Sequence, residues 1–357
     1  MKGKYIIIAV VAIIAAILPL MLDDLTFYVQ MVLAAVVVTG LSLLMGFSGQ
    51  VSLGQGAFVA VGALTVALLT TKAGVPPLIA LICAPIAAGL FAYVVGAPLL
   101  RLRGHYLAFG TLALLLIVQA VMGNITFFGG GIGISGIPPL GIGNLTVSGQ
   151  LTYAYIALIA LAVVLLISRN LVGSRFGRGI RALAGSESAA SSSGVPILRS
   201  KLSVFAISGA FAGLAGGIGA FFIPYVSQDS FPPMQSFSYV IMAVIGGLGT
   251  LWGGVIGAVL VSVLLQVLNT LGSLPGLPPT AAPMLQYAGY GIVLICVLLF
   301  IPRGIQPTIT DALARFRARR NPAGSPPPPS TSTIAQTTSS PTAGAQTTEV
   351  ESDVSSA

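Results

Sequence analysis

The sequence predicts an all-α polytopic membrane protein, and three observations support this fold class. Of the 357 residues, 55% are hydrophobic and only 7% are charged, whereas a soluble domain carries about 25% charged residues. Apolar runs recur along the chain at close to the length of about 20 residues that a helix needs to cross a bilayer. The basic residues gather on alternate loops, as the positive-inside rule requires.

The apolar runs predict about ten transmembrane helices. The first run resembles a signal peptide because Lys2 and Lys4 precede it, but it ends in L-P-L-M-L-D-D without a small-residue cleavage site. We therefore expect it to remain as an uncleaved span. The eighth run is short and leads into the glycines of G-G-L-G, where the helix could merge with the next one or break inside the membrane. The ten predicted spans are residues 5–22, 25–45, 55–71, 75–96, 106–122, 151–167, 202–223, 236–248, 251–271 and 284–301.

The distribution of charge predicts the orientation of these spans. With both termini in the cytoplasm, fifteen of the 16 basic residues lie on the cytoplasmic side, and only Lys72 lies outside together with Asp23, Asp24 and Asp229. A missing or additional span would move charges to the wrong side, so we expect ten spans with both termini cytoplasmic. The net charge of +8 reflects topology rather than nucleic-acid binding, because the basic residues are dispersed and lack interleaved stacking aromatics.

The chain is expected to have three parts. Residues 1–304 form the transmembrane domain, and residues 305–320 form a basic segment next to the membrane. Residues 311–320, D-A-L-A-R-F-R-A-R-R, could form a short helix on the anionic cytoplasmic leaflet or act simply as stop-transfer charge. Residues 321–357 are rich in Pro, Ser, Thr, Ala and Gln and have too few apolar residues to fold, so a disordered tail is predicted.

Several function classes are disfavoured by what the sequence lacks. The predicted spans contain no acidic residue, and the single histidine, His105, lies at a loop edge. Proton-driven carriers usually need ionisable groups at membrane depth, although sodium coupling through backbone carbonyls stays open. The chain has no G-x-x-x-x-G-K-S/T loop, so energy for transport would enter through a partner. Cys83 and Cys296 lie in apolar runs without metal-ligand spacing, and we expect no catalytic residue, metal or cofactor.

A polar, glycine-rich seam lies between the second and third predicted spans. Residues 46–58 read G-F-S-G-Q-V-S-L-G-Q-G-A-F, with the polar side chains Ser48, Gln50, Ser52 and Gln55. Glycines permit close approach of backbones, and short polar side chains can satisfy a broken helix or line an aqueous path. The seam is therefore either part of a translocation path or a site of tight helix packing.

The connection between the sixth and seventh predicted spans, residues 168–201, is too long and too patterned for a simple connector. Its acidic residue, Glu187, is the only one between Asp24 and Asp229. The basic content places this loop in the cytoplasm, where we expect a partner to dock against it. The loop holds six basic residues: Arg169, Arg175, Arg178, Arg181, Arg199 and Lys201.

Four further motifs complete an ordered set. They are L-L-R-L-R-G-H-Y-L-A-F-G-T from Leu99, F-G-G-G-I-G-I-S-G-I-P from Phe128, A-G-L-A-G-G from Ala212 and V-I-G-G-L-G-T-L-W-G-G from Val244. With the seam and the long loop, this set resembles the permease subunit of ATP-binding-cassette importers for branched-chain amino acids, over about three quarters of the chain. Each motif alone is weakly specific, but their order is characteristic of the family.

The resemblance implies a multi-pass protein of the bacterial inner (plasma) membrane with several partners. These are a second homologous permease, two cytoplasmic ATPases that use the ATP, and an extracytoplasmic substrate-binding protein. In the family, a short helix in a cytoplasmic loop carries an E-A-A-x-x-x-G-like element and sits in a cleft of the ATPase. Here the pattern is E-x-A-A-x-x-x-G, formed by Glu187, Ala189, Ala190 and Gly194. The preceding R-F-G-R-G-I-R-A, with Arg175, Arg178 and Arg181, also resembles the family.

The residue types in this loop suit a docking helix. Two adjacent alanines present a small surface that can enter a groove, and Gly194 followed by Pro196 can end the helix. Glu187 near the helix start is favoured by the helix dipole and could cap the helix or pair with an arginine. Two positions depart from the family: Ser186 replaces an acidic or amide residue, and Gln55 stands where a histidine is often found. The second departure makes a transfer of the family's detailed substrate specificity to this chain unsafe.

The outer side of the predicted protein includes a long uncharged segment. Residues 123–150 contain nine glycines and no charged residue, which suits a flexible lid or a landing surface for a binding protein. The resemblance implies leucine, isoleucine, valine or similar small amino acids as substrates, imported by a permease heterodimer. Urea, short amides and other small organic molecules stay open as substrates, as does homodimeric pairing. The rival from another class is a self-contained channel or an ion-coupled carrier.

Overall fold

Long apolar helices form most of the regular structure in this protein. The computed structural model describes residues 17–20, 25–102, 104–142, 145–146, 149–273, 284–285, 288–289 and 291–292. The long helices are α2 (Thr26–Ser42), α3 (Gln55–Thr71), α4 (Pro77–Leu99), α5 (His105–Asn124), α6 (Gln150–Gly173), α9 (Ile197–Phe222), α10 (Pro233–Gly246) and α11 (Leu251–Gly272).

Shorter elements join these helices. A π-helical turn, η1 (Leu43–Phe47), continues α2, and two short helices, α7 (Arg175–Gly185) and α8 (Glu187–Ser192), lie between α6 and α9. The 3-10 turns are η2 (Thr126–Phe128) and η3 (Gln228–Ser230). Four two-residue strands form two antiparallel pairs, β1 with β4 and β2 with β3: β1 (Ile134–Ser135), β2 (Gly141–Ile142), β3 (Leu145–Thr146) and β4 (Tyr225–Val226).

The structure confirms an all-α polytopic membrane protein. Among the described residues, six helical segments are long and apolar enough to cross a membrane, namely α2 with η1, α4, α5, α6, α9 and α11. The helix at Gln55–Thr71 is apolar but shorter, and the helix at Pro233–Gly246 has 14 residues. The predicted spans at 5–22 and 284–301 lie largely outside the described residues. The count of ten spans and the cytoplasmic location of both termini therefore stay predictions.

The two long helices α6 and α9 extend into the connection predicted at residues 168–201. Helix α6 continues to Gly173 and α9 already begins at Ile197, so the segment outside the two long helices is 174–196 rather than 168–201. Polar and basic residues end an apolar run without ending a helix, since arginine is a good helix former. The chain divides into the units Met1–Ala312 and Leu313–Ala357, and the second unit lies outside the described residues. The predicted segments 305–320 and 321–357 lie outside them as well.

Helix α9 is central because small residues let its neighbours approach closely. It packs against α4 through glycines at every fourth position, each facing an alanine of α4. A Cβ built on Gly213 would lie 2.2 Å from the Cβ of Ala88. Lipid is as apolar as a leucine side chain, so helix association in a membrane depends on such close packing. The facing pairs are Gly209 with Ala92, Gly213 with Ala88, and Gly217 with Ala84.

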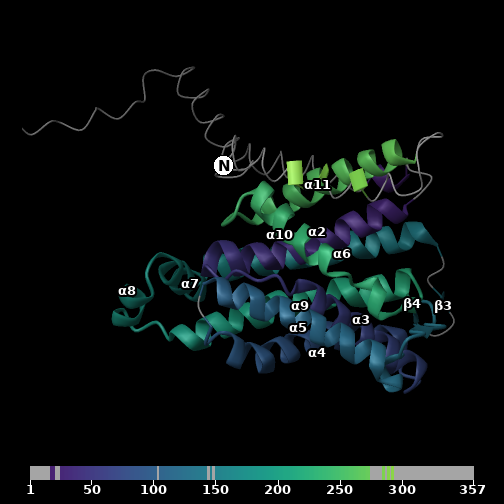
Figure 1. Ribbon diagram of the computed structural model, residues 1–357, viewed down its shortest axis with the longest axis horizontal. Coiled ribbons are helices and arrows are strands. Elements are labelled where there is room, and N and C mark those ends of the chain that lie inside the picture. The colour runs from purple at the N-terminus through teal and green to yellow at the C-terminus, as the bar shows by residue number, and fades with distance from the viewer. Residues whose placement is uncertain are drawn as a thin grey trace, which may run out of the picture. The chain divides into compact units, whose positions relative to one another are not determined.

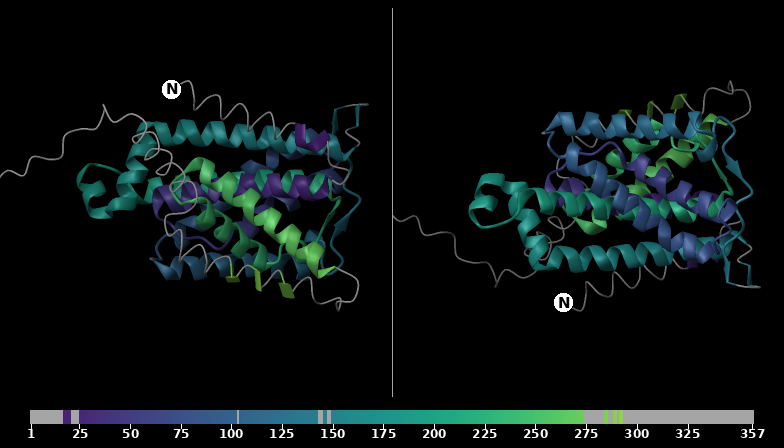
Figure 2. Two further views of the ribbon diagram at one scale, coloured as in Figure 1. Left: turned by 90° about the horizontal axis from the view of Figure 1, so that it is seen from above. Right: turned by 90° about the horizontal axis from the view of Figure 1, so that it is seen from below.

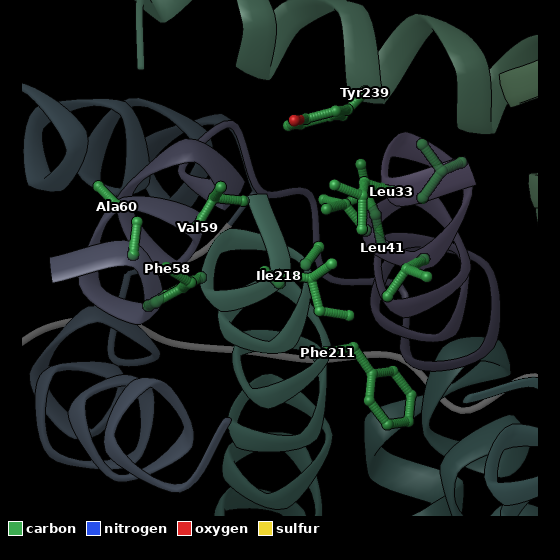
Figure 3. Packing of buried hydrophobic residues seen from close by; sticks show 14 of the residues in the cluster. Leu33, Leu41, Phe58, Val59, Ala60, Phe211, Ile218 and Tyr239 are labelled. Atoms are coloured by element: carbon green, nitrogen blue, oxygen red, sulfur yellow. The ribbon is translucent and has the colours of Figure 1, made fainter. Parts of the chain in front are cut away.

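A second face of α9 packs against α3 with similar closeness. A Cβ on Gly216 would lie 2.0 Å from the carbonyl oxygen of Val59. Phe58 of α3 lies against Gly209, and its ring meets the ring of Phe205 edge to face at a centroid distance of 5.3 Å. Figure 3 shows Phe58, Val59 and Ile218 within this core. Helix α9 thus contacts α2, α3 and α4 together.

The two ends of α9 carry different structures. With 26 residues, α9 is about 39 Å long at about 1.5 Å per residue. Helices α7 and α8 precede it, and β4 follows it, so these elements lie at opposite ends of the helix bundle (Figures 1 and 2). At the β4 end, Ile134 pairs with Val226 and Ser135 pairs with Tyr225. Part of the glycine-rich segment that the sequence suggests as a flexible lid is therefore held by strand pairing.

Candidate functional site

Helix α7 presents its arginines on one exposed face. The side chain of Ser174 caps the helix by accepting a hydrogen bond from the backbone N–H of Gly177 at 3.2 Å. Ile180 and Leu183 are buried on the opposite face. The helix is thus anchored through its apolar side, which leaves a basic surface towards solvent. That surface consists of Arg175, Arg178 and Arg181, all of which are exposed.

Helix α8 begins and ends where the sequence pattern predicts. Ser186 is its N-cap and accepts a hydrogen bond from the backbone N–H of Ala189 at 3.4 Å. After the helix, Gly194 has a φ of +79°, a left-handed conformation that favours glycine. The two alanines of the pattern differ in exposure. Ala190 is 2% exposed and packs against the rest of the chain, whereas Ala189 faces outwards. The exposed surface of α8 is therefore built from Ala189 and neighbouring serines.

Glu187 pairs with a lysine rather than with one of the predicted arginines. Its carboxylate forms an ion pair with the ammonium group of Lys201 in the second turn of α9. The Glu187 side chain is 49% exposed and that of Lys201 is 18% exposed. This contact ties α8 to the beginning of the central helix.

The same turn of α9 also contacts the polar seam. The Gln50 side-chain N–H₂ group donates to the carbonyl oxygen of Lys201 at 3.3 Å and to Ser48 Oγ at 2.8 Å. Ser48 Oγ in turn donates to the carbonyl oxygen of Leu44 at 2.6 Å. A cavity of about 360 Å³ lies beside these groups and is lined by Glu187, Lys201 and Gln50 among others. The structure therefore brings the predicted coupling residue Glu187 close to the seam.

The remaining seam residues are bonded deeper in the protein. The Gln55 side chain donates to Ser208 Oγ of α9 at 3.0 Å, and the backbone N–H of Gly54 donates to Ser52 Oγ at 3.4 Å. All four predicted path residues are at most 3% exposed. Within the part of the chain that the structure describes, they fill the break between α2 and α3.

Two buried acceptors in the seam are available for further hydrogen bonds. Gln50 Oε1 and Gln55 Oε1 accept no hydrogen bond from the part of the chain that the structure describes. Most buried polar atoms in native proteins have a partner, so such atoms indicate a water, a ligand or a functional role.

Sequence reasoning missed the residues that hold the seam together. The hydroxyl of Thr111 on α5 accepts from the backbone N–H of Leu53 at 2.9 Å, and that of Ser236 on α10 accepts from the N–H of Gly56 at 3.0 Å. With Ser208 and Lys201, they come from three helices distant in sequence. The sequence feature that could have indicated these partners is the presence of serine and threonine residues within otherwise apolar runs.

Comparisons of the sequence with known proteins identify relatives among transport permeases. A sequence model of the family described as "Branched-chain amino acid transport system / permease component" matches residues 25–298. The high-affinity branched-chain amino acid transport system permease protein LivM of Escherichia coli is 32% identical over 292 residues, covering 75% of this chain and 66% of that protein. LivM of Salmonella typhimurium matches equally. A probable LivM of Methanocaldococcus jannaschii is 29% identical over 64% of this chain and 68% of its own length.

No solved structure matches the chain. The chain spans just under two thirds of the length of the two bacterial relatives, at 66% of each. The relatives and the six long apolar helices indicate a multi-pass protein of the bacterial inner membrane. Because the family match extends over most of the chain, from residue 25 to residue 298, this chain belongs to the family of branched-chain amino acid transport permeases.

Proposed function

We propose that this chain is one of two membrane subunits of an ATP-binding-cassette importer, and that it forms one side of the path for a branched-chain or similar small amino acid. The observation that carries the proposal is the continuous contact from α8 through the Glu187–Lys201 ion pair and the Lys201–Gln50 hydrogen bond to the seam. A docking element connected in this way suits a protein that receives mechanical work from a partner.

The coupling begins at the exposed surface of α7 and α8. Arg175, Arg178 and Arg181 form its basic part, and Ala189 offers a small apolar contact beside them. A cytoplasmic ATPase bound there moves α8 when its nucleotide state changes. The ion pair passes that movement to the second turn of α9. Since α9 packs closely against α2, α3 and α4, its displacement changes the seam rather than being absorbed locally.

The other partners follow from the same architecture. A second homologous permease completes the path, two ATPases bind and hydrolyse ATP, and a substrate-binding protein delivers the amino acid at the β4 end. The chain itself then carries out no catalysis and needs no cofactor. The paired strands β1 and β4 provide a shaped surface for the binding protein.

Uptake into vesicles tests the proposal directly. The complex reconstituted with its ATPases, second permease and binding protein is supplied with labelled leucine or labelled urea, with and without ATP. Leucine uptake that requires ATP supports the proposal. ATP-dependent uptake of urea but not of leucine would show that the permease transports small amides rather than amino acids. Uptake without the ATPases would identify a channel or an ion-coupled carrier instead.

The predicted orientation is tested by labelling single cysteines. In a variant with Cys83 and Cys296 replaced by alanine, a cysteine at Ser186 should react with a membrane-impermeant thiol reagent only from the cytoplasmic side. A cysteine at Thr146 should react only from outside, because the strands lie at the opposite end of α9 from α8. Labelling of the Ser186 variant from outside would reverse the orientation and remove the argument for ATPase docking.

Replacing Gln50 with leucine should lower transport about tenfold without preventing assembly. The change removes the hydrogen bonds to Ser48 and Lys201 and the free amide oxygen but keeps a similar volume. Ser52→Leu should act in the same direction. Leucine uptake and co-purification of the ATPase measure the two effects separately. A cysteine at position 50 that is unreactive in every nucleotide state, together with normal uptake by both leucine variants, would leave only a packing role for the seam.

A further inference from the structure

A cavity of about 240 Å³ lies at the β4 end of the bundle, between α2, α3, α9 and α10. It is distinct from the seam and from the cavity beside Glu187. Figure 3 shows three of its side chains, Leu33 of α2, Val59 of α3 and Tyr239 of α10, arranged around α9. Small residues of α9, among them Ala215 and Gly219, provide the space between them.

The cavity is open at one end and closed at the other. Gln30 and Tyr225 at its rim are exposed, whereas Val37 and Ala215 at its floor are only 1% and 3% exposed. The floor lies close to the seam, because Val59 is about one helical turn beyond Gln55 on α3. A molecule in the cavity would therefore rest directly in front of the polar seam.

The lining combines apolar and neutral polar groups. Leu33, Val37 and Val59 form a branched aliphatic wall, while Gln235 and Tyr239 of α10 contribute an amide and a phenol. Among the described residues no charged side chain lines the cavity. A ligand with net charge would lose hydration there without an opposite charge to compensate, so the lining favours a molecule of zero net charge.

The surrounding helices also create a polarised environment. The first turn of α10, which includes Gln235, lies at the rim of the cavity, and helix N-termini attract negative charge. The last turn of α9, with Gly219 and Ala220 in the lining, brings the negative end of a helix dipole to the same cavity. A zwitterion can place its carboxylate near the former and its ammonium group near the latter, which an uncharged amide cannot exploit as fully.

We infer that this cavity is a binding site, within a single permease subunit, for a small zwitterionic amino acid with an aliphatic side chain. The inference rests on the proposed importer function and adds a holding site before the seam. The volume is slightly below the range of about 300–1,000 Å³ usual for drug-sized ligands, which suits a molecule of about nine heavy atoms such as leucine. The absence of a charged partner in the described lining favours weak binding and ready release.

Gly219 allows the cavity to be filled without disturbing helix packing. A Cβ built there would meet only Leu33 Cδ1, at 3.8 Å. Gly219→Phe should therefore place its ring in the cavity and reduce ATP-dependent leucine uptake at least tenfold. Ala206→Phe is the matched control, since Ala206 lines an apolar surface groove between α4 and α9. Equal uptake by Gly219→Phe and its control would overturn the inference.

A thiol at the same position gives a readout that does not depend on transport. In the reconstituted complex without ATP, leucine should slow the reaction of Gly219→Cys with an impermeant maleimide several-fold, and lysine should not. Labelling that leucine leaves unchanged, or complete protection without any amino acid as by a lipid chain, would contradict the inference. If the unsubstituted complex lacks ATP-dependent uptake but leucine still protects the thiol, the proposed function fails while the binding site stands.

Discussion

Replacing Glu187 by lysine is expected to reduce ATP-dependent leucine uptake at least tenfold while the permease still inserts and folds. The substitution breaks the ion pair with Lys201 and puts two cations side by side at the start of α8 and α9. A cation at a helix N-terminus is also unfavourable to the helix dipole. An exposed ion pair contributes only about 0.2–1 kcal/mol to the free energy of unfolding. The substitution should therefore lower transport through lost coupling to the ATPase rather than through unfolding of the permease. Vesicle uptake and co-purification of the ATPase measure the effect.

The charge-swapped double variant Glu187→Lys with Lys201→Glu separates two roles of the acid. Recovery of uptake would show that the contact between α8 and α9 transmits the movement. Uptake that stays low while ATPase binding is also lost would mean that Glu187 itself faces the ATPase. Gly194→Val provides an independent perturbation, because a β-branched residue tolerates a φ of +79° poorly and should displace the end of α8. Normal transport by Glu187→Lys and Gly194→Val together would exclude this loop as the coupling element.

Gly216→Ala is expected to destabilise the protein strongly, by about 2–3 kcal/mol, whereas Gly219→Ala should be neutral or slightly stabilising. The added methyl group at position 216 would lie 2.0 Å from the carbonyl oxygen of Val59, so α3 and α9 must move apart. At position 219 the nearest atom is 3.8 Å away, and alanine has the better helix propensity.

Thermal unfolding in detergent, followed by size-exclusion fluorescence, compares the two variants. They change the same residue type by the same group, about one turn apart on one helix. A lower midpoint for Gly216→Ala only would support close packing as the force that holds α9 in place. Equal midpoints would mean that α3 and α9 are less tightly packed than the distances indicate.

Helix positions were predictable because the bilayer limits them. The apolar run at 55–71 is the helix Gln55–Thr71, and the run at 251–271 is extended by one residue to Gly272. The helices extend beyond the predicted spans at the C-terminal end of α6 and the N-terminal end of α9. Hydropathy reports where a chain meets lipid, whereas helix ends depend on capping groups such as Ser174 and Gly194.

The candidate site was predictable only as a set of residue types. Polar side chains in an apolar context drew attention to Gln50 and Gln55, and the pattern around Glu187 indicated a docking helix. Their partners Lys201 and Ser208 were not predictable, because they are 151 and 153 residues away in the chain. The local sequence does not indicate which helix will face a given side-chain amide. Likewise, Glu187 pairs with Lys201 rather than with an arginine because the start of α9 brings Lys201 next to α8.

The sequence by itself determined the membrane class, the position of most helices and the family, because apolar length and motif order are properties of the chain alone. The tertiary structure decided which helices touch. It placed α9 at the centre by matching its glycines to the alanines of α4 and the backbone of α3. It also created the cavity near Gly219 and the connection from α8 to the seam. Both arise where several helices meet, and the gaps and contacts between helices depend on side-chain volumes summed across segments far apart in sequence.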